Sequence, residues 1–490
     1  MTIRRILGSL AKHGLLFVTY GALGVVITVV AAVLWVGVHR VPSLKPWQQA
    51  SFQTEFTAAD SARVPDMDAY RALEDRLFKE LRQQVYDRVA EADRRQLNRF
   101  SLGSLSDPTS YAENGNRSYE LAVDKPKCGA LLVHGLTDSP RILRTLGARL
   151  HDRGCWVVGL RLPGHGTAPS ALTSVRWEDW AAAVRMAARH VRTRVGADVP
   201  VYLVGFSTGA ALSVEYALAR LEGEALPRVD GLILLSPAIG VDPLAWLAVW
   251  QSRLSTLPGL GNLAWLDVNP EYDPYKYTSF PVNAGQQIYL VTTVINARLT
   301  RLATKGPVRG FPRTLVFQSV ADATVSPQAV VTIFLSRLAP EGHQLVAFDI
   351  NRFAEATPLL RADSRDPAEH LLRGPPWTFD VTLVTNRDTT SLAIVALRRA
   401  AGDSAVRSEP TDLTWPTGVF SLSHLALPVP PDDPLYGAVP PAKRGALYLG
   451  RLELLGEQGL LAIPPNALVR LRFNPFFPYV RERTERFLFQ

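Results

Sequence analysis

The chain contains very little cysteine, with only Cys128 and Cys155 among 490 residues. Two cysteines exclude a disulfide-rich scaffold and a four-cysteine zinc site, so we expect neither a metal centre nor a cofactor. Each cysteine directly precedes an apolar segment, 129–134 and 156–162. If these segments are neighbouring parallel strands, the two sulfurs lie at similar heights and can form a disulfide, with two buried free thiols as the alternative.

Acidic residues are absent from the first 45 positions, although the whole chain has 45 of them against 53 Lys and Arg. The same stretch holds five basic residues: Arg4, Arg5, Lys12, Arg40 and Lys45. They supply five of the eight net positive charges and leave three for the rest of the chain. Because the basic residues flank the first apolar segment, the net charge indicates membrane orientation, and we expect no nucleic-acid partner.

Charged residues are also absent from residues 15–38. A helix of this length covers ~36 Å at 1.5 Å per residue, which is enough to span a bilayer. A cleaved signal peptide is the alternative, but its apolar region is shorter and ends at a small-residue cleavage site, which this segment lacks. We therefore predict a single-pass transmembrane anchor at 15–38. The small excess of basic residues favours a cytoplasmic tail at 1–14 and places the bulk of the chain on the extracytoplasmic, or periplasmic, side.

Internal repeats and low-complexity tracts are absent as well, and the remaining pattern divides into a few segments. Residues 39–118 read as a linker with an amphipathic helix, from Asp66 to about Glu91, that we expect to pack on the main domain. Residues 119–240 alternate short apolar runs with helical stretches. That alternation predicts an α/β fold, with a mostly parallel central sheet and helices on both faces.

Tryptophan, proline and apolar helical patterns interrupt the alternation at residues 241–310, which we interpret as a helical cap inserted over the sheet edge. Strand patterns resume afterwards, so residues 311–490 are predicted to be the second part of the core. Within that part we expect an insertion at 351–420 and a C-terminal extension.

The strongest motif is Gly205-Phe206-Ser207-Thr208-Gly209, the G-x-S-x-G pattern. A serine hydroxyl needs an exposed position on a tight turn and a neighbouring base to become a nucleophile. The glycines Gly205 and Gly209 permit that turn, and the pattern lies between a predicted strand, 201–204, and a predicted helix. We therefore predict Ser207 as the nucleophile of a strand–elbow–helix turn.

A second motif, His134-Gly135-Leu136-Thr137, directly follows the predicted strand that ends at Val133. Acyl transfer needs hydrogen-bond donors aimed at the oxyanion of the tetrahedral intermediate. In a strand–elbow–helix enzyme these come from the residue after the nucleophile and from an earlier strand-end loop. The backbone N–H groups of Leu136 and Thr208 are the predicted oxyanion hole, and His134 is expected to shape the loop.

Residues 129–240 resemble the bacterial carboxylesterases and the monoglyceride lipase and lysophospholipase-like serine hydrolases of the α/β-hydrolase superfamily. The matching stretches are LLVHGLTDSP, LPGHGTAP, WEDW and VGFSTGA. The resemblance implies an α/β-hydrolase fold with a cap, and ester hydrolysis on acyl substrates through a Ser–Asp–His triad.

The acid and the base of such a triad follow the serine in the order acid, then histidine. Asp322 comes just after the predicted strand 314–318 and is the expected acid, because Asp349 lies inside a strand pattern. Among the later histidines, His343 precedes a strand and would point away from the relevant sheet edge. We predict His424, in a serine-flanked turn, as the base, with His370 as the alternative.

The predicted function is hydrolysis of carboxylic esters through an acyl-enzyme on Ser207. An apolar cap and a membrane anchor favour lipid-like substrates such as a monoacylglycerol or a lysophospholipid. Two other hypotheses stay open: an acyltransferase that uses the same triad with an alcohol acceptor, and a catalytically inactive, membrane-tethered binding protein.

Overall fold

The computed structural model describes residues 43–94, 97–240, 261–353, 366–442, 445–454 and 469–489, with scattered positions between 13 and 31. The predicted tail and most of the predicted anchor therefore lie outside the described residues, as do 241–260 of the predicted cap and 354–365 of the predicted insertion. No helix in the described part of the chain is both long and apolar enough to cross a membrane.

A large mixed sheet forms the centre of the molecule, and its strand order is β1-β3-β2-β4-β5-β8-β9-β10-β11-β12. The strands from β3 to β10 in this order run parallel, whereas β1, β11 and β12 pair antiparallel. Their bounds are β1 Tyr119–Leu121, β2 Cys128–Val133, β3 Cys155–Leu160, β4 Val201–Phe206, β5 Gly231–Leu235, β8 Arg313–Ser319, β9 Gln344–Phe348, β10 Asp380–Asn386, β11 Ala393–Arg399 and β12 Val406–Thr414.

The central strands are short apolar runs that are buried on both faces, as parallel strands covered by helices require. Their register brings the carboxyl ends together, because Val133 of β2 pairs with Gly205 of β4, and Leu235 of β5 pairs with Phe317 of β8. The segments that follow β2, β4 and β8 therefore emerge at one edge of the sheet.

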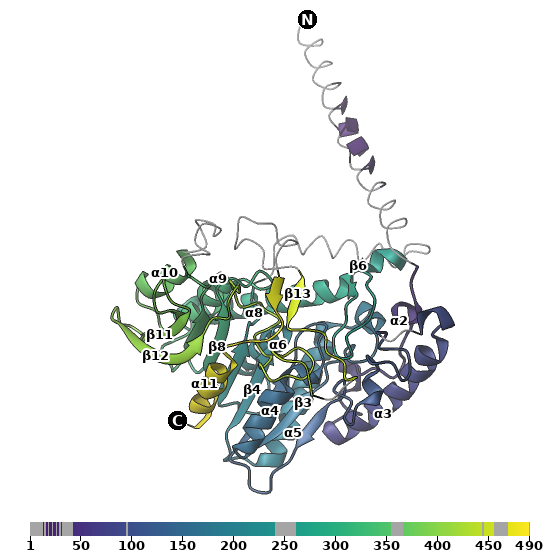
Figure 1. The fold of residues 1–490 in the computed structure, drawn as a ribbon, viewed down its shortest axis with the longest axis horizontal. Helices are drawn as coiled ribbons and strands as arrows, with labels where there is room; N and C mark the ends of the chain where they lie inside the picture. The colour runs from purple at the N-terminus through teal and green to yellow at the C-terminus, as the bar shows by residue number, and fades with distance from the viewer. Residues whose placement is uncertain are drawn as a thin grey trace, which may run out of the picture.

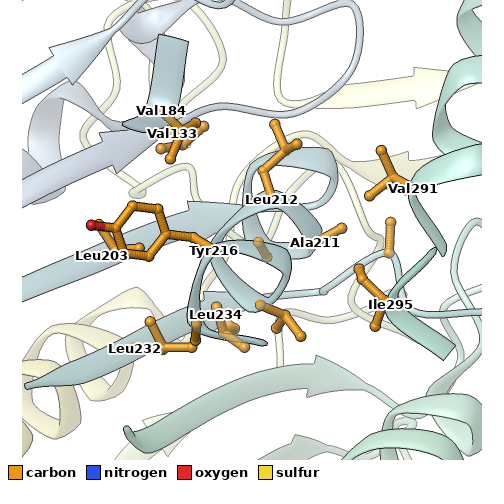
Figure 2. Packing of buried hydrophobic residues seen from close by; sticks show 14 of the residues in the cluster. Val133, Val184, Leu203, Ala211, Leu212, Tyr216, Leu232, Leu234, Val291 and Ile295 are labelled. Carbon is orange, nitrogen blue, oxygen red and sulfur yellow. The ribbon is translucent and has the colours of Figure 1, made fainter. Parts of the chain in front are cut away.

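Helices cover the two faces of the sheet and bury separate hydrophobic clusters. On one face lie α5 Trp177–Val195, α6 Thr208–Leu221 and α8 Val282–Leu302, and on the other lie α4 Arg144–Asp152 and α11 Phe477–Phe489. Figure 2 shows side chains of α6 between those of β4 and β5 and those of α8. The result is the three-layer α/β architecture that the strand–helix alternation predicts.

The described part of the predicted cap, residues 261–310, differs from that expectation. Its long helix, α8, packs on α6 and buries Val291, Ile295 and Leu299 in the main hydrophobic cluster, so it belongs to the helical layer of the core. A short hairpin of β6 Trp265–Asp267 and β7 Phe280–Pro281 precedes it. An apolar helical pattern predicts burial but does not say against which surface, and this is why the sequence suggested a cap.

The predicted insertion at 351–420 also differs from expectation, because β10, β11 and β12 continue the central sheet. Figure 1 shows β11 and β12 at the end of the molecule remote from α3. Helix α10 Asp366–Arg373 packs against β10. Between β8 and β9 the chain forms an irregular helical segment that consists of α9 Pro327–Ala329, a π turn Val330–Phe334 and a 3-10 turn Leu335–Arg337.

The segment before the sheet packs on the core through α2 Pro46–Gln49 and α3 Met67–Gln84. The Asp66 side chain accepts a hydrogen bond from the Ala69 N–H and caps α3. The fully buried Arg161, just after β3, pairs with Glu55 and Glu74 of this segment, each at 2.9 Å. A buried cation with two carboxylate partners fixes the segment on the main domain, since removing Arg161 would leave two carboxylates without their counter-charge.

The C-terminal part of the chain returns to the sheet. The strands β13 Leu452–Leu454 and β14 Val469–Leu471 pair antiparallel, and α11 follows. The Tyr202 hydroxyl of β4 donates to the Leu488 carbonyl at 3.0 Å and ties α11 to the strand that leads to Ser207.

Cys128 and Cys155 are direct partners in the register of β2 and β3, and the structure joins them in a disulfide. Their Cα atoms are 4.5 Å apart, and both side chains are fully buried. The bond therefore closes two neighbouring strands at the edge of the sheet opposite Ser207.

Candidate active site

Ser207 lies in the turn between β4 and α6. Its backbone φ is 51°, a value that residues other than glycine rarely adopt. Close contacts with neighbouring backbone atoms explain why both residues that flank this turn are glycines. A Cβ on Gly205 would lie 2.4 Å from the Cα of Ala210, and a Cβ on Gly209 would lie 2.0 Å from the Val133 carbonyl oxygen. The sequence therefore holds the serine on a strained, tight turn directly beside the end of β2.

Neighbouring strands and turns fix the backbone of this elbow. The Ser207 N–H donates to the Leu235 carbonyl at the end of β5 at 2.9 Å. The Ser207 carbonyl accepts hydrogen bonds from the N–H groups of Ala211 and Ala238 at 3.1 and 3.2 Å. Both backbone groups of the serine are thus paired, and the strained conformation is held from two sides.

Asp322 lies just after β8, at the same sheet edge as Ser207. Its Oδ1 accepts from the N–H groups of Thr324 and Val325 at 2.9 and 3.0 Å. Its Oδ2 accepts from the Gln318 side chain at 3.0 Å and lies 2.8 Å from Nδ1 of His424. Burial would raise the pKa of this carboxyl, but the His424 ring and the hydrogen bonds outweigh it and lower the pKa.

His424 lies in a loop between β12 and β13 and is buried. Besides the Nδ1 contact with Asp322, its ring lies 5.1 Å, between centroids, from the ring of Phe206, the residue before Ser207. The structure therefore places the imidazole beside the elbow. With Nδ1 held by the carboxylate, Nε2 is the nitrogen left to exchange a proton with a hydroxyl.

The backbone N–H groups of Leu136 and Thr208 lie at the facing ends of β2 and α6. Among the described residues, neither amide donates a hydrogen bond to another group. Thr137, the residue after Leu136, has a positive φ of 66°, and its carbonyl accepts from the Tyr277 N–H at 2.9 Å. These contacts hold the loop in a strained shape with the Leu136 amide unpaired, as an anion-binding site requires.

His134 and His165 are buried below this loop and have structural contacts. His134 Nε2 accepts from the Leu162 N–H at 3.1 Å, so Nδ1 carries the proton and donates to the Gly135 carbonyl at 2.8 Å. His165 Nδ1 lies 3.0 Å from the Pro163 carbonyl. Burial lowers the pKa of His165 to about 4 and that of His134 well below its ordinary value, so both rings are neutral at pH 7.

The other candidate residues lie outside this group. His370 is on α10 and packs on Trp377, with 5.5 Å between ring centroids. His343 precedes β9, at the opposite sheet edge, and contacts Phe311. Asp349 follows β9 and binds Arg352, with 2.5 Å between Oδ2 and Nε.

Sequence reasoning missed several residues that support the site. Gln318 is in β8, four residues before the aspartate that it contacts, and only the strand geometry brings them together. The Ser423 hydroxyl donates to the Leu471 carbonyl, and the Asn474 side chain donates to the Leu427 carbonyl, both at 3.1 Å. These contacts join segments about 50 residues apart, so no local pattern in the sequence predicts them. The described residues contain no cluster of three or more metal-ligating side chains.

Comparison with known proteins finds similarity in the core of the chain. Residues 124–349 match the model of the family described as serine aminopeptidase, S33. The chain is 26% identical over 225 residues to a thermostable monoacylglycerol lipase of Bacillus sp. (strain H-257), covering 46% of this chain and 78% of that protein. It is 29% identical over 119 residues to the phospholipase YtpA of Bacillus subtilis (strain 168), covering 24% and 43% of the two chains.

Among solved structures, the monoacylglycerol lipase of Paleococcus ferrophilus is similar with a TM-score of 0.35 and 19% identity, covering 47% of this chain and 88% of that one. The family match and the relatives in sequence support a carboxylic ester hydrolase. The chain resembles the bacterial carboxylesterases and monoglyceride lipases of the α/β-hydrolase superfamily.

Proposed function

We propose that this protein is a serine esterase that hydrolyses lipid-like carboxylic esters through Ser207, His424 and Asp322. The observation that carries the proposal is the 2.8 Å contact between His424 Nδ1 and Asp322 Oδ2, with the imidazole packed beside the strained elbow that presents Ser207. A base oriented by a carboxylate next to an elbow serine is the arrangement that activates a hydroxyl nucleophile.

In the proposed reaction, His424 Nε2 takes the proton of the Ser207 hydroxyl as its oxygen attacks the ester carbonyl. Asp322 holds the ring in the required tautomer and stabilises the imidazolium that forms. The N–H groups of Leu136 and Thr208 bind the oxyanion of the tetrahedral intermediate. His424 then returns the proton to the leaving alcohol, and a water activated in the same way releases the acid from the acyl-enzyme.

Two features support a lipid-like substrate at a membrane. The relatives in sequence are named as a monoacylglycerol lipase and a phospholipase. The uncharged segment 15–38, with basic flanks, supports a single-pass anchor that leaves the catalytic part outside the cytoplasm. Resistance of the full chain to alkaline extraction from membranes, and cleavage of its catalytic part by protease added to spheroplasts, test this location.

The test of the activity compares Ser207→Ala with Ser213→Ala in the full chain. Ser213 lies on α6, where its hydroxyl donates to the Gly209 carbonyl at 2.8 Å, so it is a matched serine outside the proposed mechanism. We expect Ser207→Ala to lose hydrolysis of a p-nitrophenyl ester and labelling by a fluorophosphonate, whereas Ser213→Ala keeps both. Full activity of Ser207→Ala would refute the assignment.

The same assay separates the alternatives. An amino-acid p-nitroanilide, run beside the ester, measures peptidase activity of the kind named in the family description. Product analysis with competing alcohols measures acyl transfer. Folded wild-type protein that neither turns over an ester nor reacts with the fluorophosphonate would support a binding protein instead.

A further inference from the structure

A cavity of about 590 Å³ opens beside the proposed active site. Thr137 and Asp138, from the loop of Leu136, form one wall, and Leu425, the residue after His424, forms another. The 267–280 segment and the C-terminal residues Arg470 and Arg472 complete the lining. The volume is in the range of small-ligand sites, and the position is that of a substrate's leaving group or acyl group.

The Arg472 side chain in this wall is a cation that lacks a partner in the described structure. Its Nε is buried and makes no hydrogen bond among the described residues. The guanidinium carbon lies 5.8 Å from the centroid of the Tyr436 ring, so the fork is held over an aromatic face. An unpaired, partly buried guanidinium is costly unless an anion completes its hydrogen bonds.

The carboxylates near Arg472 have other hydrogen-bond or ion-pair partners, or lie in solvent. Oδ1 of Asp273 accepts from the N–H groups of Tyr275 and Lys276, and its Oδ2 accepts from the Tyr436 hydroxyl at 2.5 Å. Asp433, just behind this wall, binds Arg141 at 2.8 Å. Asp267 also lines the cavity, but it is exposed to solvent. None of these described carboxylates pairs with Arg472.

Lys276 supplies a second cation to the same cavity. Its Nζ lies 3.7 Å from Oδ1 of the buried Asp138, which is a loose contact. Burial raises the pKa of Asp138, and the nearby Lys276 opposes that shift. Arg472 and Lys276 thus approach the cavity from different segments with charge that the described acids do not fully compensate.

We propose that this cavity binds the phosphate of a substrate's head group, with Arg472 and Lys276 as its ligands. The inference rests on the proposed esterase function and assigns its substrate class as phosphate-bearing monoacyl esters, in preference to neutral monoacylglycerols. A guanidinium fork matches phosphate oxygens in pairs, and a lysine adds a point charge.

The kinetic test uses a monoacylglycerol and the 3-phosphate of the same monoacylglycerol, with equal chain length. We expect wild-type protein to have the higher kcat/KM on the phosphate ester. Arg472→Gln is expected to lower that kcat/KM about tenfold or more, mainly through KM, and to leave the neutral ester unchanged. Arg451→Gln is the matched control. Arg451 lies opposite Arg472, because the Arg472 N–H donates to the Arg451 carbonyl, but the Arg451 side chain is exposed. A wild-type preference for the neutral ester, or an equal loss on both esters in Arg472→Gln, would overturn the proposal.

Binding is measured separately so that failure of the site and failure of the esterase are distinguishable. Calorimetry on Ser207→Ala protein compares glycerol 3-phosphate, glycerol and inorganic phosphate. Binding of glycerol 3-phosphate that is stronger than that of both other probes, and that Arg472→Gln abolishes, supports the head-group site even if no ester is turned over. Equal binding of inorganic phosphate and glycerol 3-phosphate would indicate a site for a free anion and would refute the head-group assignment.

Discussion

The imidazole of His424 is held by residues from distant parts of the chain. Asp322 fixes its Nδ1, Phe206 packs on its ring, and Ser423 fixes the adjacent backbone through the Leu471 carbonyl. A side chain positioned from three sides loses little freedom when a substrate binds, so the proposed proton acceptor is already oriented in the structure.

This arrangement predicts different outcomes for the two histidines that the sequence left open. His424→Asn is expected to lower kcat on a p-nitrophenyl ester by about 10³-fold or more, because the proton acceptor is lost. His370→Asn, on α10 beside Trp377, is expected to keep kcat within a few fold. Steady-state kinetics on both variants, with circular dichroism to confirm folding, provide the measurement, and the reverse order of effects would contradict the site.

The strand-end positions of Ser207 and Asp322 could be predicted because both residues follow short apolar strands. In a parallel sheet, the ends of such strands come together at one edge. The choice between His424 and His370 could not be made in this way. His424 is 102 residues from the aspartate it contacts, and the intervening chain contributes four strands, β9 to β12, to the sheet. The local sequence around a histidine does not indicate whether such a long connection brings it back to the aspartate.

At the scale of elements, the C-terminal segment around β14 supports the loop that carries His424. The Asn474 side chain donates to the Leu427 carbonyl at 3.1 Å, and the Asn474 N–H donates to the Val429 carbonyl at 2.8 Å. The sequence indicated an extension here but gave no reason for it. The structure gives one, because these hydrogen bonds set the height of the histidine loop above the sheet edge.

Asn474→Ala tests this support. We expect kcat to fall about tenfold or more with little change in KM, because the base is displaced by a fraction of an ångström while the cavity remains. Asn283→Ala is the control, since the Asn283 side chain on α8 also donates to two backbone carbonyls, those of Leu172 and Val175, away from the histidine loop. Both variants should lose ~1–3 kcal/mol of unfolding free energy, but only Asn474→Ala should lose turnover. Equal kcat in the two variants would show that the segment is only structural.

Elements that the sequence assigned to a cap and an insertion became parts of the core for a common reason. Apolar periodicity in α8 and in β10 reports that one face is buried, but it does not identify the surface that buries it. The strands β10 to β12 extend the sheet by pairing their edges, and edge pairing leaves no residue-level signal beyond the strand pattern itself. The sequence could therefore predict the central strands but not how far the sheet continues.

On the scale of the whole molecule, three buried histidines link stability to pH. Burial lowers the pKa of His165 and of His343 from 6.5 to about 4, and it lowers the pKa of His134 well below 6.5. The unfolded chain binds protons at these rings between pH 6.5 and 4, whereas the folded chain does not. The free energy of unfolding must therefore decrease as the pH falls through this window.

The displacement of one such pKa from 6.5 to about 4 corresponds to ~3 kcal/mol. We expect urea denaturation at pH 7 and pH 5 to show a clear loss of stability at the lower pH. His165→Gln should reduce the difference between the two pH values, because one proton-binding site of the unfolded chain is removed. Asp322 acts only at lower pH, since its carboxyl pKa is lowered from 3.8 and its stabilising contacts are lost as the pH falls through that lowered value. A pH dependence that is the same in His165→Gln and wild type would contradict this account.

The hydrogen bond from Tyr202 to the Leu488 carbonyl bears on how the protein is made. The strand that leads to Ser207 and the loop that carries His424 are both secured by residues between 471 and 488. During synthesis, the proposed nucleophile, Ser207, is translated long before these supports leave the ribosome. The growing chain can collapse around its first strands, but the proposed catalytic centre is completed only after α11 docks, so an unfinished chain would lack the proposed activity.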